Sequence, residues 1–370
     1  MKKLIGTVAM AALLATAAFA ELNIGAGWNK GVWTPFFLEK VEEEDVKISM
    51  KLGTPWGGAV RTGISFAGAG ENIGFVLDIK AGDDNSVVSI NDNSYVWAKP
   101  WDWLEIRAGQ WFGDALRSAQ SYGIRDSNRI GLGNTEITTF ARMYGGFYDD
   151  PKKGALLAIT PIEGLFIGAG FDIANGGTRE AVDVFKGSQY AVGYTIADLL
   201  AIKAQYIGGK TAGVFGGGDF NDDLDGTINA GLDLLMLEGM KIGIGAYIPL
   251  EDDSKISVAA TFDGGFDELS VNAYVGAEIA RAELGYHGIE AGVGLGYDLG
   301  NGIGLSGDLR YRIDLPKPDG LDAKNEVTVG FFVSKGMSNG GISLGVEGDF
   351  KFGGEKYIGI AIPLAITCGF

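Results

Sequence analysis

The feature that most constrains this chain is a period-two alternation of apolar and polar side chains that recurs along most of its length. In segment 357–370, one parity is apolar and mostly bulky, whereas the other is almost entirely small. In segment 342–351, one parity is mostly Ile, Leu, Val and Phe, whereas the other holds Ser343, Glu347 and Asp349. Because successive side chains of a strand point to opposite faces, this pattern predicts strands with one apolar and one polar face.

The same alternation recurs in segments 73–80, 104–107, 202–206, 228–234 and 303–313. Charged residues lie on one parity and are nearly absent from the other. Strands of a soluble sandwich also have two faces, but charge is avoided on the apolar parity along most of the chain. Lipid explains this avoidance, because a charge at mid-bilayer costs roughly 2–4 kcal/mol. We therefore expect an all-β protein, a transmembrane antiparallel β-barrel.

The N-terminus has the pattern of a secretory signal. Lys2 and Lys3 precede an apolar stretch, Ile5 to Leu14, and Ala18-Phe19-Ala20 has small residues where cleavage occurs. We expect a cleavable signal peptide over 1–20 and one barrel domain over 21–370. The alternative, an N-terminal anchor, is disfavoured because the apolar stretch is short for a bilayer. The rest of the chain has no run of about 20 uncharged apolar residues that would predict a transmembrane helix.

Composition excludes several other classes. The chain holds 61 Gly but only 9 Pro, and it lacks a Gly-X-Y period, so it is neither collagen-like nor a disordered Pro/Gly linker. Its single cysteine, Cys368, cannot form an internal disulfide. The net charge of −17 argues against a nucleic-acid partner.

Turn signals set the expected number of strands. Short turns are predicted within four segments: Lys99–Ile106, Thr160–Ile167, Ala197–Leu200 and Leu237–Met240. Longer polar segments are predicted as loops at the opposite end: Phe37–Asp45, Gly82–Asn85, Asn175–Gly187, Lys210–Asp225, Glu251–Asp253 and Ile313–Lys324. The alternation of turn and loop predicts about 18 strands, with 16 as the alternative. A barrel of about 18 strands is wide enough for an aqueous channel.

The architecture resembles that of the general porins of the bacterial outer membrane. The chain ends on Phe370, an aromatic on the lipid-facing parity of an amphipathic last segment, which resembles the assembly signal of such barrels. The resemblance implies a multi-pass protein of the outer membrane, in contact with its lipid. It also implies recognition of the last strand by the barrel-assembly machinery and pairing of that strand with the first. General porins are usually trimers, and a homotrimer is therefore an expectation that nothing in the sequence fixes.

The loop over 113–153 is much longer than the others. It is predicted to join strands five and six, which makes it the third extracellular loop. In general porins the third loop folds into the barrel and narrows it. The resemblance therefore suggests a pore constriction formed by the charged residues of this loop: Asp114, Arg117, Arg125, Asp126, Arg129, Glu136 and Arg142. The alternatives are an external loop and one extra hairpin over 138–148.

Charged residues on the inward parity are the candidate pore wall. The basic members are Arg61, Lys80, Arg107, Lys203, Lys241, Arg310, Arg312 and Lys351. The acidic members are Asp78, Glu105, Asp172, Asp233, Glu290, Asp308, Glu347 and Asp349. The two signs nearly balance, so the wall predicts little selectivity. Acidic loops at the mouth would concentrate cations and favour a weak cation preference.

Catalytic and cofactor chemistry is not indicated. The only histidine, His287, lies in a Gly-rich stretch and predicts no Ser-His-Asp site. Segment 219–226 is rich in Asp but lacks the Gly and Glu positions of an EF-hand; a solvated acidic loop is favoured over a loose Ca²⁺ site. The glycines of 292–296 fall in an alternating segment without a following helix, so they do not predict a phosphate loop. We expect no enzyme activity, cofactor or metal.

Aromatic residues allow two interpretations. Tryptophans near predicted strand ends suit the interfacial girdles of a barrel: Trp33, Trp56, Trp97, Trp101 and Trp103. A sugar-guiding track would need aromatics on the inward parity. These are few and scattered, which disfavours a dedicated sugar channel: Trp111, Phe166, Tyr274, Phe332 and Tyr357.

The sequence thus predicts a passive, water-filled channel for ions and small hydrophilic solutes. The alternative is a non-conducting surface barrel, an adhesin or structural protein, which long acidic loops would suit equally well. Small and short polar residues on the inward parity favour the open channel.

Overall fold

The structure is a computed structural model that describes eleven ranges of the chain. They are 21–25, 29–52, 63–81, 88–111, 152–172, 188–208, 226–250, 255–280, 287–315, 324–353 and 356–369. Segment 1–20, the expected signal peptide, lies outside the described residues.

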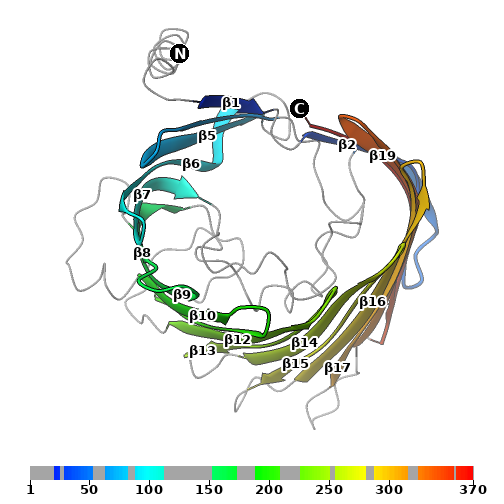
Figure 1. The fold of residues 1–370 in the computed structure, drawn as a ribbon. Helices are drawn as coiled ribbons and strands as arrows, with labels where there is room; N and C mark the ends of the chain where they lie inside the picture. The colour runs from blue at the N-terminus through cyan, green and yellow to red at the C-terminus, as the bar shows by residue number, and fades with distance from the viewer. Residues whose placement is uncertain are drawn as a thin grey trace.

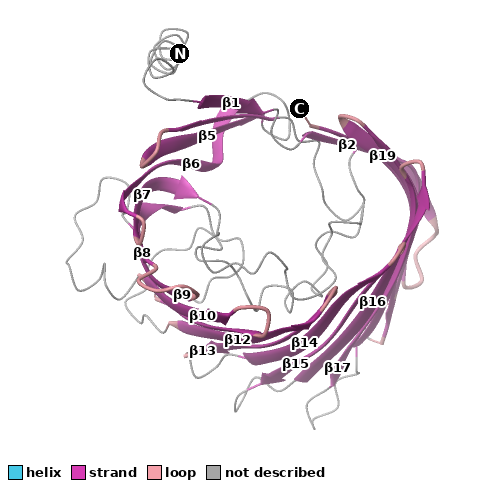
Figure 2. Cartoon of the chain, in the orientation of Figure 1, coloured by secondary structure: helices cyan, strands magenta, loops and turns pink. Residues whose placement is uncertain are grey.

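The described residues form 20 strands joined by turns and loops, without an α-helix among them (Figure 2). The strands are β1 (Glu21–Gly25), β2 (Asn29–Val41), β3 (Lys47–Leu52), β4 (Gly63–Ala69), β5 (Ile73–Ala81), β6 (Val88–Trp101), β7 (Leu104–Trp111), β8 (Lys152–Ile159), β9 (Leu165–Asp172), β10 (Gln189–Ile196), β11 (Leu200–Ile207), β12 (Thr227–Leu237), β13 (Met240–Pro249), β14 (Lys255–Phe266), β15 (Leu269–Ala280), β16 (His287–Gly300), β17 (Ile303–Leu315), β18 (Lys324–Met337), β19 (Gly340–Phe352) and β20 (Tyr357–Cys368).

All 20 strands belong to one antiparallel sheet that curves around a central lumen (Figure 1). From β4 to β20, each strand pairs with the next one along the chain. The path continues from β20 to β2 and β3 at one end, and from β4 to β1 at the other. The expected all-β antiparallel barrel architecture is confirmed, although the described ladders do not close the ring completely.

The direction of the strands explains the difference between 20 strands and the expected 18. Direction alternates along the path, because every pairing is antiparallel. It follows that β1 and β2 run in the same direction, and so do β3 and β4. When each of these two pairs is taken as one crossing, the 20 strands make 18 crossings. The predicted 18 strands correspond to crossings of the barrel wall. The structure has 20 strands because each of the first two crossings consists of two separate strands.

The N-terminal and C-terminal strands meet. Strand β2 pairs with β20 from Asn29 opposite Cys368 to Val41 opposite Tyr357. This is the pairing of first and last strands that the sequence predicts. The terminal Phe370, expected to signal assembly, lies outside the described residues.

Two expected loops are shorter in the structure than the sequence indicates. Residues 37–41 belong to β2, because a bulge around Pro35 shifts the register and lets the strand continue. Proline lacks the N–H that a regular ladder requires, so it is tolerated in a strand at such an irregularity. Similarly, β17 continues to Leu315 and β18 begins at Lys324, so 313–315 is strand rather than loop.

Short connections dominate one end of the barrel, whereas those at the other end range from the four residues of 353–356 to the 40 residues of 112–151. Eight connections of two to five residues lie at one end of the barrel, and they include all four turns predicted from the sequence. The connection over 112–151 joins β7 to β8, which are the fifth and sixth crossings, so its predicted place as the third long loop is confirmed. Its path lies outside the described residues.

The tight turns use backbone conformations that suit a hairpin. Between β16 and β17, Asn301 and Gly302 have φ values of 53° and 72°. Two successive residues with positive φ are typical of the turn that matches strand twist, and Asn-Gly is its favoured sequence. Asp198 and Asp267 also adopt positive φ in their turns.

The outward face is apolar around the sheet. Exposed side chains on this face include Val192, Ile244, Val275, Leu309 and Leu344, each from a different strand. Their pairing partners are also apolar or small: Ile244 lies opposite Ala260, and Leu344 lies opposite Leu364. A soluble protein does not expose so much contiguous apolar surface, so this face requires lipid.

A helical membrane span is not found. The described ranges hold no helix that is long and apolar enough to cross a bilayer.

The orientation of the two faces can be tested on β15. Val275 is 52% exposed on the outward face, whereas Asn272 lies on the inward face and donates a hydrogen bond to Asp263. We expect Val275→Arg to lower the free energy of unfolding in lipid vesicles by roughly 2–4 kcal/mol, because it places a charge in lipid. The matched Asn272→Arg should change it by less than about 0.5 kcal/mol, since the new cation faces water and Asp263. Equal losses in the two variants would contradict the assigned faces.

Candidate functional site

The candidate site is the inward face of the barrel, where polar and charged residues of neighbouring strands meet in register. Glu290 lies opposite Arg312 on β16 and β17, and Arg312 lies opposite Glu326 on β18. One level away, Arg310 lies opposite Thr328, which lies opposite Asp349 on β19. The first row alternates in sign, and the second has neutral Thr328 between Arg310 and Asp349, so neighbouring strands do not repel across this part of the wall.

The group on β16–β19 is also the most deeply buried. Glu290 and Glu347 have no exposed surface, and Arg310 is only 2% exposed. The Tyr274 hydroxyl donates a hydrogen bond to Glu290, and Arg312 Nη1 lies 4.0 Å from Glu290 Oε2. These charges are held by their neighbours and form a fixed wall rather than mobile side chains.

A second group bridges β11, β12 and β13. The Asp233 carboxylate is 3% exposed, and its Oδ2 atom lies 3.3 Å from Lys203 Nζ and 3.2 Å from Lys241 Nζ. Two ammonium groups therefore converge on one carboxylate. Lys203, Asp233 and Lys241 together carry a net charge of about +1. Asp263 of β14 lies directly opposite Lys241 and is a second carboxylate next to this group.

A third group lies on β6 and β7. Glu105 accepts hydrogen bonds from Arg107 Nε at 3.1 Å and Arg107 Nη2 at 2.6 Å. Lys99 Nζ lies 3.4 Å from the other carboxylate oxygen of Glu105. The Arg107 guanidinium also lies over the ring of Tyr95, at 4.5 Å from its centroid. Charge pairing and stacking together fix the position of this arginine.

The register and burial of the strands place most of the predicted wall residues on the inward face. They are Asp78, Glu105, Arg107, Lys203, Asp233, Lys241, Glu290, Asp308, Arg310, Arg312, Glu347, Asp349 and Lys351. Lys80 and Asp172 lie at strand positions of the same parity. Arg61 lies outside the described residues, as do all seven residues of the candidate constriction loop: Asp114, Arg117, Arg125, Asp126, Arg129, Glu136 and Arg142. Their role remains a prediction.

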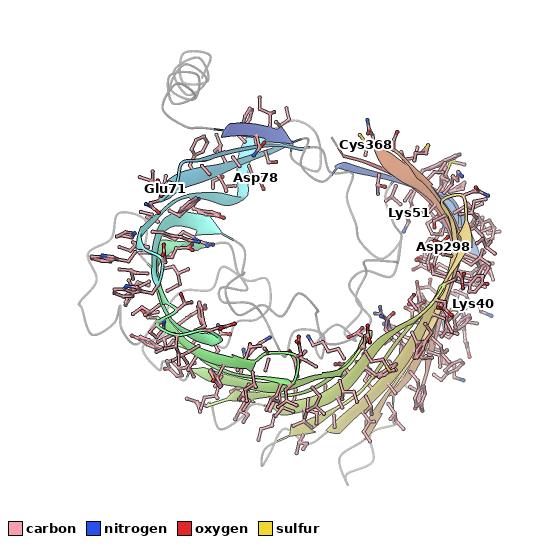
Figure 3. The ribbon with its side chains drawn as sticks, in the orientation of Figure 1. Lys40, Lys51, Glu71, Asp78, Asp298 and Cys368 are labelled. Atoms are coloured by element: carbon pink, nitrogen blue, oxygen red, sulfur yellow. The ribbon has the colours of Figure 1, made fainter. Side chains whose placement is uncertain are left out.

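Several inward residues were not expected from the sequence. Lys51 extends into the ring and lies over the inward Phe37, at 4.5 Å from the ring centroid (Figure 3). Lys51 could have been found from the alternation of β3, in which Ile48 and Met50 are exposed outward. Lys99 lies in a segment predicted as a turn, although β6 continues through it. Asp263 and Glu326 could have been found from the alternation of their own strands.

Trp97 was predicted for the outer girdle, and this assignment is wrong. It lies directly opposite Arg107 and therefore faces the lumen, whereas Val96 beside it is 56% exposed outward. Its ring lies against inward-facing Gly74 of β5, where an added Cβ would come within 2.7 Å of the indole. The sequence position near a strand end was misleading, because parity rather than depth decides the face. Trp33, Trp101 and Trp103 are exposed outward as expected, and Trp56 lies outside the described residues.

Other inward aromatics also lie across glycines of a neighbouring strand. The ring of Tyr274 covers Gly292, and the ring of Phe332 covers Gly345. A side chain at either glycine would collide with the ring. Glycines at these positions therefore let large rings lie against the wall.

A metal site is not indicated in the part of the chain that the structure describes, since no group of three His, Cys, Asp or Glu residues could hold an ion. The acidic segment 219–226 lies outside that part. His287 is the first residue of β16. Hydrogen bonding and ion pairing, rather than bond-making chemistry, are what the described wall offers.

Comparison with solved structures gives the fold. OpdO of Pseudomonas aeruginosa is 10% identical, and the match covers 95% of this chain and 98% of that chain with a TM-score of 0.57. OpdL of the same organism is 13% identical, with 95% and 99% covered and a TM-score of 0.56. The chain has a porin-like outer-membrane β-barrel fold. No protein-family model and no curated protein matches the sequence.

The porin-like barrel is multi-pass, and the outer membrane is the location typical of bacterial barrels with this two-faced wall. A mutant of the Rh. blastica porin also aligns, at 14% identity over 94% of this chain and 100% of that chain, with a TM-score of 0.49. At these identities the likeness concerns the fold. Activity must be argued from the wall itself.

The Lys203–Asp233–Lys241 group offers a test of that wall. Asp233→Asn leaves two ammonium groups without their shared carboxylate, so the lumen gains positive charge. We expect the permeability ratio of K⁺ to Cl⁻ to fall, on the order of two-fold, in reversal-potential measurements. Lys203→Met removes a positive charge from the same group and should raise the ratio. Shifts of the same sign in both variants would show that these residues do not face the permeating ions.

Proposed function

We propose that this porin-like barrel is a water-filled channel for passive diffusion of ions and small hydrophilic solutes, with a weak preference for cations. The observation that carries the proposal is the lumen wall, where fixed charges of both signs and hydrogen-bonding groups line a barrel with an apolar exterior. Such a wall suits a lumen filled with water or polar solutes, because charges that face an apolar interior would be costly.

The proposed mechanism for ions is electrostatic guidance by the charged wall. Acidic and basic groups alternate across β16–β19, and because Glu290 and Glu347 have no exposed surface, they act on a permeating ion through their electric field rather than by direct contact. Fixed rings and patches of charge select ions by sign, and a wall of mixed sign discriminates weakly. The seven charged residues of loop 113–153 are proposed to narrow the lumen and shape the local field.

Carboxylates at the short-turn end support the cation preference. Six of the eight short turns carry at least one exposed acidic residue: Glu71, Asp102, Glu163, Asp198, Glu238, and Asp267 with Glu268. Asp298 lies just before a seventh turn. A ring of carboxylates around a pore mouth raises the local concentration of cations. The acidic loops at the opposite mouth would act in the same direction.

The proposal includes the biogenesis expected for such a barrel. Segment 1–20 is proposed as a signal peptide removed on export, which leaves a single barrel domain over 21–370. The last strand, ending at Phe370, is proposed to engage the barrel-assembly machinery. A homotrimer is proposed from the general-porin resemblance. The barrel is proposed to be non-enzymatic.

Single-channel recording tests the central proposal. The mature protein, reconstituted in a planar bilayer, should give stable ohmic steps that scale with bulk salt conductivity. Heat-modifiable migration on a gel would first establish that the sample is a folded barrel. Silence from folded protein would reject the channel and favour a non-conducting surface barrel.

The carboxylate ring gives a separate prediction. The triple variant Glu163→Gln, Asp198→Asn, Glu238→Gln should lower cation selectivity in dilute salt, where the Debye length is about 30 Å. The difference should vanish near 1 M salt, where it is about 3 Å. The selectivity of the variant near 1 M salt therefore serves as the control, because a structurally damaged pore would differ from the wild type at both salt concentrations. A selectivity unchanged in dilute salt would remove the ring from the mechanism.

A further inference from the structure

A recess of about 280 Å³ lies in the inward wall at the short-turn end of β6–β9. Its apolar lining comes from Leu156 and Ala158 of β8 and Phe166 of β9. Its polar lining comes from Lys99, Glu105 and Arg107, with Asp102 and Thr160 at the turn end. The function proposed above uses the charges of this region only as part of the wall.

The recess exists because small residues lie between large ones on the same face. Ala158 lies opposite Glu105 on one side and Gly168 on the other. The short side chains at positions 158 and 168 leave space between the larger residues around them. Phe166 packs against the cluster formed by Leu156, Ala158 and Ala191. The result is a depression with an aromatic side chain on one side and an apolar floor.

The polar side of the recess is fixed before any solute arrives. Glu105 is held by Arg107 and Lys99, at 2.6–3.4 Å. Arg107 is held in turn by the ring of Tyr95, and Lys99 Nζ lies 5.6 Å from the ring centroid of Trp97. Donors and acceptors that are already oriented lose little conformational freedom on binding, which favours recognition of a defined arrangement of hydroxyls.

The charge of the recess selects against ions. Two cations, Lys99 and Arg107, are matched by two carboxylates, Asp102 and Glu105. An anion would meet no excess of positive charge, and a cation would have to compete with Arg107 for Glu105. A neutral solute with hydroxyl groups can instead accept from the cations and donate to the carboxylates. Hydrogen bonds to charged groups are the stronger ones in water.

The apolar side limits the shape of such a solute. Phe166 provides contact for a C–H face above the buried Leu156, and the recess is small for a small-molecule site, so it admits one ring rather than a chain of rings. A pyranose has a C–H face and a rim of hydroxyls. We propose that this recess is a subsite for a monosaccharide-sized pyranose crossing the channel. The inference rests on the proposed channel function and adds a solute class to it.

The test compares D-glucose with sorbitol, a linear polyol of similar size that lacks the rigid ring, in planar-bilayer recordings of the mature protein. Glucose should reduce the current in a saturable way beyond the loss caused by viscosity, whereas sorbitol should cause only the viscosity loss. Phe166→Leu keeps most of the apolar volume but removes the flat face. It should weaken the apparent affinity for glucose about ten-fold.

Phe331→Leu is the matched control, because the same substitution falls on the lipid-facing side of β18, where Phe331 is 54% exposed. It should leave glucose block unchanged. If Phe166→Leu does not yield folded barrel, Thr160→Val at the edge of the recess takes its place and should weaken block several-fold. Equal effects of glucose and sorbitol, or wild-type block in the folded recess variant, would overturn the subsite.

Binding can also be measured without conduction. Saturation-transfer NMR of glucose with detergent-solubilised barrel should show contact with the wild-type protein and a weaker signal with Phe166→Leu. A silent bilayer with a positive NMR result would reject the channel and retain the subsite. Ohmic conduction without glucose contact would retain the channel and reject the subsite.

Discussion

The structure depends on one constraint: in lipid, every backbone N–H and C=O must find a partner within the protein. Water cannot satisfy these groups, and an unpaired edge costs several kcal/mol for each exposed group. From β4 to β20 the sheet meets this constraint by pairing each strand with its neighbour along the chain, and it continues the ladder by bringing β2 to β20. The two-faced strands, the tight turns and the lumen all follow from a sheet that must curve back on itself.

With the backbone paired, the side chains divide according to solvent. The outward parity holds residues such as Ile244 and Leu344, which lipid tolerates. The inward parity holds charges that pair across strands, as Glu290 and Arg312 do. Pairing holds the wall charges in place, so the electrostatic character of the lumen is a property of the fold rather than of flexible side chains.

The period-two pattern was sufficient to predict the fold class and the crossings, and it assigned most of the described charged residues to the face on which the strand register places them, because lipid penalises a charge on the wrong face so strongly. The period-two pattern failed where a bulge shifts the parity of a strand, and where a residue was assigned by its position near a strand end instead of by its parity. Pro35 interrupts the ladder of β2, and so Phe37 could not be assigned to the lumen. Trp97 was assigned by its depth near a strand end, although its pairing with Arg107 places it inside. The recess on β6–β9 is formed by residues of four paired strands. It could not be predicted from the sequence, because no single segment shows how the four strands are aligned.

The pairing of β2 with β20 has a consequence for how the barrel forms. Asn29 and Cys368 are partners although more than 300 residues separate them in the chain. Contacts of such high sequence separation form late and slowly, because the loop that they close must first lose its conformational freedom. Until the last strand is made, β2 retains an open edge that could pair with another chain. The rate of correct assembly should therefore be governed by whatever protects that edge, rather than by the stability of the finished barrel.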